Sequence, residues 1–371
     1  MNKYWENISE QIKAKEILDS FFEIRRVPHA FIFSGQEGVG KFNTAIQFAK
    51  SINELISGAN NNSLSQRIDE LQEPYIKLIM PLPRGKGETS EDSGIEKLPK
   101  EVIEDLKGEL QKKAKNPYYK IAIENANTIK ISSIREIKKF ISLTSDSSGF
   151  RFVIILDSEF MNDQAQNALL KSLEEPPLGI IFILLTSQKE KLLPTIVSRC
   201  REIIFEPLSK DAVRQILINN FSIESQIAKK VSNFSDGSVT QAIQLIGYDF
   251  EAIQQKTISV LRYAFARKYQ SALSEILNFS KNQPDDAILF LLKMIKTWLN
   301  DVVRHRKSVD ELAFEDSRET IEKFNSKFFD SNIEVPFSNL EYLESCFSRN
   351  MNLNVLFLNL IFELASVVKR N

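Results

Sequence analysis

One short stretch constrains the fold more than any other, because a predicted strand runs directly into a glycine-rich loop that a predicted helix follows. The strand covers 29–33, the loop has the pattern G-x-x-x-x-G-K, and the helix covers 43–53. In this order a loop can hold phosphate, since glycine allows positive φ and lets backbone N–H groups approach an anion closely. The residues that would hold phosphate are Gly35, Gly38, Gly40 and Lys41. With 12 glycines in 371 residues, the probability of a chance match is on the order of a few per cent, which favours an ancestral phosphate-binding loop.

The residue after the lysine removes most of the chemistry of this loop. A working phosphate-binding loop places Ser or Thr there to hold Mg²⁺, whereas this chain has Phe42, which carries no oxygen on its side chain. Neither Asn43 nor Thr44 has the spacing to replace it. Residual nucleotide binding stays open, but magnesium-dependent hydrolysis is not supported.

A second predicted strand, over 152–156, leads to the same conclusion independently. It ends at Asp157, where a metal-organising carboxylate belongs, but Ser158 stands in place of the glutamate that would polarise water. A register without a gap would instead put Leu156 and Asp157 at these two positions. One carboxylate is missing in either register, and Glu159, on a strand, would not point where its neighbour does.

The stretch 166–205 carries the most specific pattern in the chain. A helix that ends at two prolines is followed by a fully buried strand over 180–186 and then by a short final strand. Just before that last strand stand Ser198, Arg199 and Cys200. An arginine is always charged and presents a rigid fork of donors to phosphate oxygens, so Arg199 is a candidate arginine finger. The alternative is an ordinary surface ion pair.

Two segments of this stretch, NALLKSLEEPP and LLPTIVSRC, resemble the signature of the clamp-loader ATPase subunits of the AAA+ family, specifically the delta-prime subunits of bacterial DNA polymerase III. The resemblance is strong over 27–205 and moderate as far as Ile246. It implies that Arg199, within the S-R-C motif, reaches into the ATP site of a neighbouring subunit.

The resemblance also exposes a third departure from a working ATPase. The segment 237–242 is similar to the family's G-S-x-R-D-A helix start, and Thr240 replaces the arginine that would sense a γ-phosphate. Phe42, the broken acidic pair and Thr240 together favour a degenerate ATPase, because each lost group normally supplies orders of magnitude in phosphoryl transfer.

The resemblance further implies an α/β fold, with a parallel-sheet AAA+ P-loop domain, a small helical lid and an all-α collar. We place these parts at 1–207, 208–250 and 251–371. Ser209 is expected to cap the first lid helix. The closing segment 353–368 is more apolar than one helical face requires, which fits association as a collar and fits core packing about as well.

The first domain contains an irregular insert at 51–119. Loop-forming residues gather over 57–65 and 81–99, and a helix is predicted over 101–115, either as a solvated amphipathic helix or as a partner-binding one. Many family members carry a four-cysteine zinc module in this region. This chain has two cysteines in all and no histidine with companions at ligand spacing, so we expect no zinc.

A helix predicted over 131–143 has basic side chains on one side. Comparable helices in clamp loaders line the chamber that holds DNA, where phosphate contacts are independent of sequence. The candidate DNA contacts are Lys130, Ser132, Arg135, Lys138 and Lys139. A plain solvated face explains the same pattern about as well.

The net charge of −1 excludes a globally basic nucleic-acid binder, so contact with DNA would need a local patch or partners. Two distant cysteines, a polar amino terminus and no long apolar run lead us to expect a cytoplasmic protein. We expect a noncatalytic clamp-loader subunit without a required cofactor. Its expected partners are motor and delta-like subunits, the sliding clamp and primed DNA. The alternatives are an ATP-hydrolysing motor subunit of the loader and an unrelated AAA+ scaffold.

Overall fold

The computed structural model describes residues 3–24, 26–57, 62–71, 75–88, 92, 94–142, 149–281, 287–309, 311–347 and 352–368. The chain divides into two compact units. The first unit comprises Met1–Ser222 and Asp236–Gln241, and the second comprises Ile223–Ser235 and Ala242–Asn371. The finer division into three domains, with boundaries at 207 and 250, stays a prediction.

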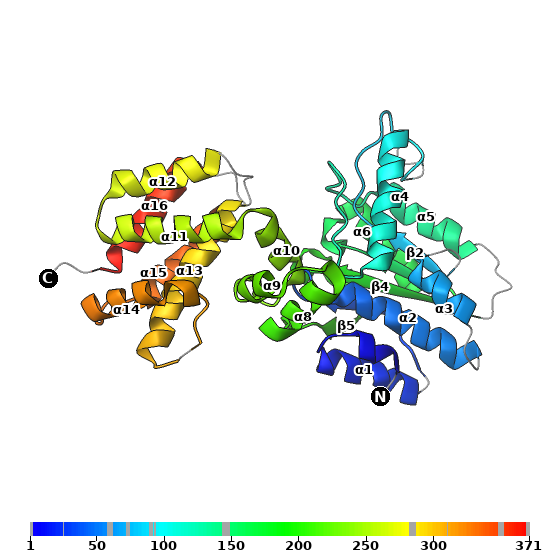
Figure 1. The fold of residues 1–371 in the computed structure, drawn as a ribbon. Helices are drawn as coiled ribbons and strands as arrows, with labels where there is room; N and C mark the ends of the chain where they lie inside the picture. The colour runs from blue at the N-terminus through cyan, green and yellow to red at the C-terminus, as the bar shows by residue number, and fades with distance from the viewer. Residues whose placement is uncertain are drawn as a thin grey trace. The chain divides into compact units, whose positions relative to one another are not determined.

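The first unit is built on a five-stranded parallel sheet, in the order β2-β3-β4-β1-β5 (Figure 1). The strands are β1 (Ala30–Ser34), β2 (Ile76–Ile79), β3 (Arg151–Ile155), β4 (Ile180–Thr186) and β5 (Arg201–Ile204). The central strand β4 is buried along its whole length, as expected of a parallel strand covered on both faces. The predicted α/β fold with a parallel sheet is therefore confirmed.

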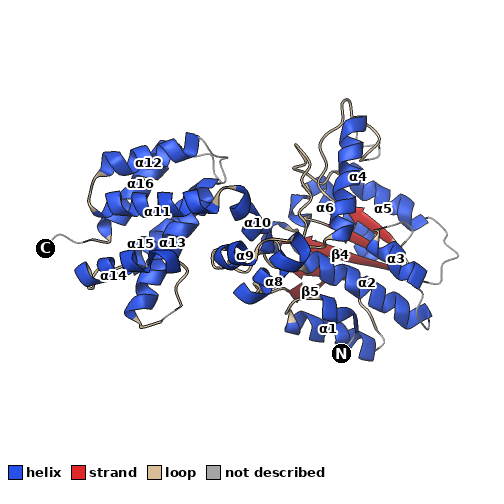
Figure 2. Ribbon diagram, in the orientation of Figure 1, coloured by secondary structure: helices blue, strands red, loops and turns tan. Residues whose placement is uncertain are grey.

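Eleven helical segments, counting the short turn η3, lie wholly in this unit among the described residues. They are η1 (Lys3–Asn7), α1 (Ile12–Glu23), α2 (Lys41–Ser57), α3 (Asn62–Asp69), α4 (Lys100–Lys115), α5 (Ile131–Ser142), η2 (Ser158–Phe160), α6 (Asp163–Glu174), α7 (Pro194–Val197) and α8 (Lys210–Phe221), and the short turn η3 (Lys189–Lys191) joins β4 to α7. Figure 2 draws the helices in blue. Ser209 caps α8 as expected, because its Oγ accepts a hydrogen bond from the N–H of Ala212 at 3.1 Å.

The insert at 51–119 is more regular than the sequence suggests. It contributes β2, which pairs with β3 at the edge of the sheet. The sequence did not predict this strand, because four residues are too few to show an alternation of buried and exposed side chains. Within the predicted loop over 57–65, residues 62–65 begin α3, while 58–61 lie outside the described residues.

The core of the first unit lies on both faces of the sheet, because successive side chains of a strand point to opposite sides. On one face, Ile32 and Phe182 pack with side chains of α5, α6 and α7, such as Leu169. On the other face Phe31 meets Phe48 of α2, with 5.3 Å between ring centroids. The two faces fix β1 rigidly and so position the loop that follows it.

The second unit is helical throughout its described residues. Its elements are α9 (Ser225–Ser232), most of α10 (Val239–Gly247), α11 (Phe250–Phe265), α12 (Tyr269–Lys281), α13 (Ala287–Arg306), η4 (Glu315–Ser317), α14 (Arg318–Lys327), α15 (Glu334–Phe347) and α16 (Leu353–Ser366). α13 packs against α11, α14 and α15.

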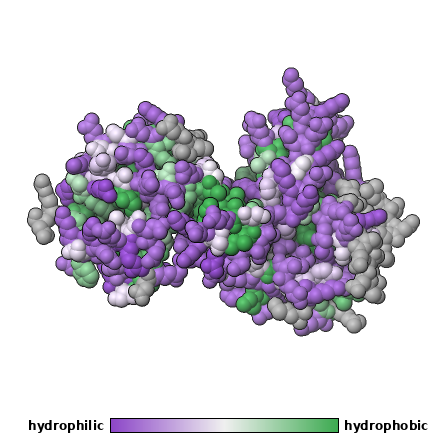
Figure 3. Space-filling model, in the orientation of Figure 1, coloured by the Kyte–Doolittle hydropathy of each residue, from purple (hydrophilic) through white to green (hydrophobic). Residues whose placement is uncertain are grey.

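The closing helix α16 is only partly accounted for by packing inside its unit. Leu360 and Leu364 are buried against neighbouring helices, whereas Val355 is half exposed and so is Phe362, which packs on Tyr269. Both explanations of its apolar excess therefore stay open. No helix within the described ranges is both long and apolar enough to cross a membrane. In the view of Figure 3 the surface is mainly hydrophilic, with apolar side chains gathered in a few places.

Candidate functional site

The glycine-rich loop joins β1 to α2 and packs against the segment 236–241 of the same unit. Gly38 has φ +76°, and a Cβ atom there would lie 2.5 Å from the backbone nitrogen of Thr240. Glycine is thus required for both conformation and space. Ser238 Oγ donates a hydrogen bond to the carbonyl oxygen of Glu37 at 2.7 Å. The structure brings together the loop and Thr240, as the resemblance implied.

Lys41 turns back onto the loop that precedes it. Its Nζ donates hydrogen bonds to the carbonyl oxygens of Gly35 and Gln36, the second at 2.7 Å. Burial lowers the pKa of Lys41 to about 8, and the carboxylates of Glu159, Asp157 and Glu37 oppose the shift. Carbonyl oxygens of the loop therefore accept hydrogen bonds that the Lys41 ammonium could otherwise donate to a phosphate.

A second lysine, Lys113 of α4, lies over the residue that replaces the magnesium ligand. Its Nζ is 4.5 Å from the ring centroid of Phe42, a cation–π contact, and it donates hydrogen bonds to the carbonyl oxygens of Pro117 at 2.9 Å and Tyr119 at 2.6 Å. Burial lowers the pKa of Lys113 to about 8, against the attraction of Asp157 and Glu37. Sequence reasoning missed this residue, because nothing in the pattern of 101–115 sets it apart from the other lysines.

The segment 116–121, which follows α4, covers the loop. Tyr118 lies against Gly40, where an added Cβ would be 3.3 Å from its Oη, and Lys120 pairs with Glu37 at 2.9 Å. The cavity left beside the loop measures about 80 Å³. Pockets that bind small molecules usually have a volume of at least about 300 Å³. A water molecule takes up about 30 Å³, so this cavity has room for two or three waters but cannot enclose a nucleotide.

The acidic residues after β3 are divided between the cavity and the core. Asp157 lines the cavity, and burial, followed by Glu37 and Glu159, raises its pKa to about 6. Glu159 accepts hydrogen bonds from the N–H and the hydroxyl of Ser187. Ser158 donates its hydroxyl to the carbonyl oxygen of Leu185 at 3.0 Å. Only one carboxylate of this group, Asp157, is therefore placed to face the loop.

The S-R-C motif forms a corner at the surface between α7 and β5. Arg199 is exposed, and its guanidinium pairs with Glu174 at 2.7 Å and donates to the carbonyl oxygen of Thr195 at 2.9 Å. Ser198 Oγ donates to the same carbonyl oxygen at 3.1 Å. Burial raises the pKa of Cys200 to about 12, so its thiol stays protonated and packs with the core. Among the described residues that line the loop's cavity, Arg199 is absent, so this arginine does not serve its own loop.

The candidate DNA contacts on and beside α5 fall into two sets. Lys130 pairs with the buried Glu88 at 2.6 Å, and Ser132 Oγ donates to the same carboxylate at 3.2 Å. Since α5 begins at Ile131, both Ser132 and Ser133 lie inside the helix and do not cap its start. The exposed members of the set are Arg135, Lys138 and Lys139.

The described residues contain no group of three His, Cys, Asp or Glu side chains that could hold a metal ion. Both cysteines, Cys200 and Cys346, are free thiols.

Comparisons with known proteins place these features in context. The family described as "DNA polymerase III, delta subunit" matches residues 10–209. Subunit delta' of DNA polymerase III from Bacillus subtilis is 26% identical over 269 residues, which cover 71% of this chain and 68% of that protein. Subunit gamma from Buchnera aphidicola subsp. Schizaphis graminum is 30% identical over 232 residues, which cover 61% of this chain and 52% of that protein. The chain thus spans roughly half to two thirds of the length of these two relatives.

Among solved structures, a DNA polymerase III gamma subunit-related protein from Thermotoga maritima has a TM-score of 0.42 and 14% identity, covering 94% of this chain and 98% of that one.

Proposed function

We propose, from the premise that this chain belongs to the DNA polymerase III delta subunit family of clamp-loader proteins, that it is a noncatalytic clamp-loader subunit of the delta-prime type. It would act in the cytoplasm within a hetero-oligomer that contains motor subunits and a delta-like subunit. There it would donate Arg199 to a neighbouring ATP site and help to load the sliding clamp onto primed DNA.

The observation that carries the proposal is the small cavity beside the glycine-rich loop. Phe42 offers no ligand to Mg²⁺, the ammonium of Lys113 lies on its ring, and about 80 Å³ of space remains. A nucleoside triphosphate could enter only if α4 and the segment 116–121 moved away. This arrangement supports a subunit that does not hydrolyse ATP itself.

The surface position of Arg199 supports a role in trans. Its guanidinium is held by one carboxylate and one carbonyl oxygen, which limits its rotamers while leaving it exposed to solvent. An arginine finger supplied by another chain is typically worth about 10³ to 10⁵ in rate, so a subunit without its own activity can still control the ATPase of the assembly.

Contact with DNA would come from the exposed set Arg135, Lys138 and Lys139, through phosphates and without sequence preference. Lys130 and Ser132 contribute less in this proposal, because Glu88 already binds both. The second unit, with its exposed apolar residues on α16, would provide the collar contacts.

The test is the DNA-dependent, clamp-stimulated ATPase of a loader reconstituted from motor subunits, a delta-like subunit and this chain. Arg199→Ala should leave assembly intact on size-exclusion chromatography and lower the turnover of the adjacent site by about 10³-fold or more. The matched control is Arg201→Ala, because Arg201 is also exposed and lies two residues further along the chain. An unchanged rate in the Arg199 variant would show that the finger assignment is wrong.

A second measurement separates this role from that of a motor subunit. Titration of the isolated chain with a fluorescent ATP analogue and Mg²⁺ should give no saturable binding. Hydrolysis by the isolated chain that disappears in Lys41→Ala would favour a motor subunit. Failure to co-purify with the loader's motor subunit would mean that the chain does not act as a subunit of that loader.

A further inference from the structure

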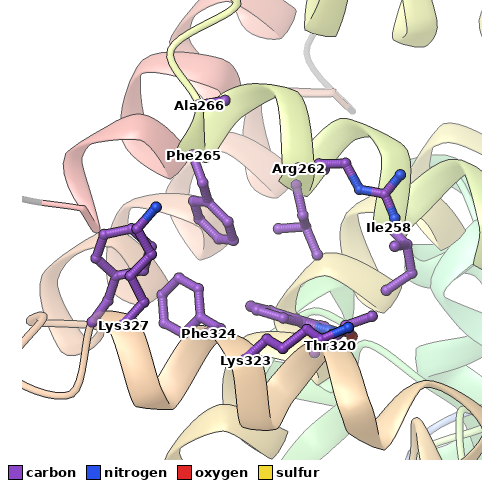
Figure 4. Close-up of a pocket in the computed structure, with 11 residues that line it drawn as sticks. Ile258, Arg262, Phe265, Ala266, Thr320, Lys323, Phe324 and Lys327 are labelled. Atoms are coloured by element: carbon purple, nitrogen blue, oxygen red, sulfur yellow. The ribbon is translucent and has the colours of Figure 1, made fainter.

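The second unit contains a groove between α11 and α14 (Figure 4), and Trp298 of α13 also lines it. Its volume is about 350 Å³. Phe265, Trp298 and Phe324 form an aromatic floor, with ring centroids 4.9 to 5.7 Å apart. Since a cavity of ~150 Å³ can take a benzene molecule, the groove has space for about two large apolar side chains.

The rim of the groove is basic. Arg262 of α11 and both Lys323 and Lys327 of α14 are exposed and line it. Lys323 pairs with Glu319 on its own helix. Within the part of the chain that the structure describes, Arg262 and Lys327 have no carboxylate partner. Since Glu319 compensates Lys323, Arg262 and Lys327 remain as an excess of two positive charges at the rim, in a chain with a net charge of −1.

We propose that this groove binds an acidic, amphipathic helical segment of a partner protein. Two apolar side chains one helical turn apart would enter the aromatic floor, and carboxylates on the flanks of the same helix would meet Arg262 and Lys327. The pairing of a buried apolar anchor with charges at the rim is the arrangement that gives both affinity and orientation in such complexes.

The exposure of the aromatic residues favours a peptide over a single-stranded nucleic acid. Stacking of bases requires open ring faces, whereas Trp298 is 3% exposed and Phe324 is 6% exposed. The apolar side chains of a partner helix project from its backbone, so they can enter the groove and reach the recessed aromatic rings. The basic rim would attract phosphates too, so the experiment must separate charge from the apolar contact.

The test uses the full chain and a fluorescein-labelled, end-capped 16-residue helical peptide that carries Phe and Leu one turn apart between flanking glutamates. Binding is followed by fluorescence anisotropy at two salt concentrations. One control peptide replaces the glutamates with lysine, and another replaces Phe and Leu with alanine. We expect the first peptide to bind at least ten times more tightly than either control, and more weakly at high salt.

Three variants of the chain locate the contact. Arg262→Glu combined with Lys327→Glu should weaken binding at least tenfold by charge, and Ala266→Trp should do so by filling the groove from its exposed edge. Lys307→Glu, which changes an exposed lysine outside the groove, should leave binding within twofold, and circular dichroism should show that all variants fold. The proposal is overturned if the lysine peptide binds as tightly, or if both groove variants bind normally. It is equally overturned if the chain dimerises through the groove and Ala266→Trp abolishes the dimer.

Discussion

The first unit has cationic side chains at two places that matter for ATP binding or hydrolysis. The side chains point into the protein at one place and toward solvent at the other. Beside the glycine-rich loop, Lys41 and Lys113 point inward and are bound by carbonyl oxygens of the chain itself. At the S-R-C corner, Arg199 points outward and is held by Glu174 at the surface. The difference teaches that cations at two places in one unit can serve the chain in different ways. The inward cations are hydrogen-bonded to the chain itself beside a small cavity, while the outward one is exposed to solvent.

The largest expected effect tests whether the corner works through its shape or only through its charge. Arg199→Lys keeps the charge but loses the planar fork of donors, so we expect the reconstituted loader to lose about 10²-fold or more in the single-turnover rate of the adjacent site. Arg201→Lys is the control and should have no effect. A lysine variant with the normal rate would mean that geometry at the corner is unimportant.

The next effect tests whether the glycine-rich loop is now a structural element. Gly38→Ala should lower the free energy of unfolding by about 3 kcal/mol, because it combines a positive φ with a Cβ atom 2.5 Å from the Thr240 nitrogen. Gly87→Ala shares the positive φ, at +68°, but meets nothing within 4 Å, and should cost about 1 kcal/mol. If urea denaturation showed the same loss of unfolding free energy for both variants, close packing around Gly38 would not contribute to the stability of the loop.

A third prediction concerns the burial of Lys113. Its pKa is about 8 in the folded chain against 10.5 ordinarily, so between these values the unfolded chain holds a proton that the folded chain has lost. Stability therefore rises with pH through that window, and Lys113 contributes about 3 kcal/mol to the rise. Lys113→Met should remove this part of the rise.

The measurement for Lys113 is the difference in unfolding free energy between wild type and variant from pH 7 to pH 10.5. Lys41 titrates in the same window and repels Lys113, and it remains in both proteins, so the difference reports the loss of Lys113 and of this repulsion. Asp157 and Glu37 face Lys113 and remain in both proteins. Lys120→Met, at the exposed pair with Glu37, is the control and should leave the slope unchanged. A Lys113 variant whose curve parallels the wild type would mean that this lysine is well solvated.

The smallest effect concerns the ion pair that holds Arg199. Glu174→Gln should change stability by less than about 0.5 kcal/mol, since both partners are partly exposed. The loader's ATPase should nevertheless fall about threefold, because the guanidinium would sample more rotamers. Glu175→Gln, one residue along the same motif and equally exposed, should change neither quantity.

Local pattern was sufficient to predict the sheet's main strands. β1, β3 and β4 are runs of apolar residues bounded by glycine, proline or polar residues, and each lies within one residue of its predicted range. β2 escaped prediction because four residues in a segment rich in loop-forming residues show no period. Its place in the sheet depends on pairing with β3, which is a contact distant in sequence.

The candidate site was predictable where it depends on single residues and not where it depends on pairs. Phe42 directly follows the lysine of the loop, so its position in the sequence is enough to show that a side-chain oxygen for Mg²⁺ is missing there. The contact of Lys113 with Phe42, and the capture of Lys130 by Glu88, join residues that are far apart in the chain and have no distinguishing neighbours. Such pairs arise from tertiary packing. The sequence therefore suggested that Lys130 is available to DNA or solvent, whereas the structure pairs it with Glu88 and leaves its side chain mostly buried.

The ammonium that rests on Phe42 is covalently attached to the chain. Unlike a bound ion, it cannot be extracted by a chelator or diluted away, and its supply does not vary with the metabolic state of a cell. If the chain acts in the proposed loader, the positive charge at this position would stay the same while neighbouring subunits exchange nucleotide.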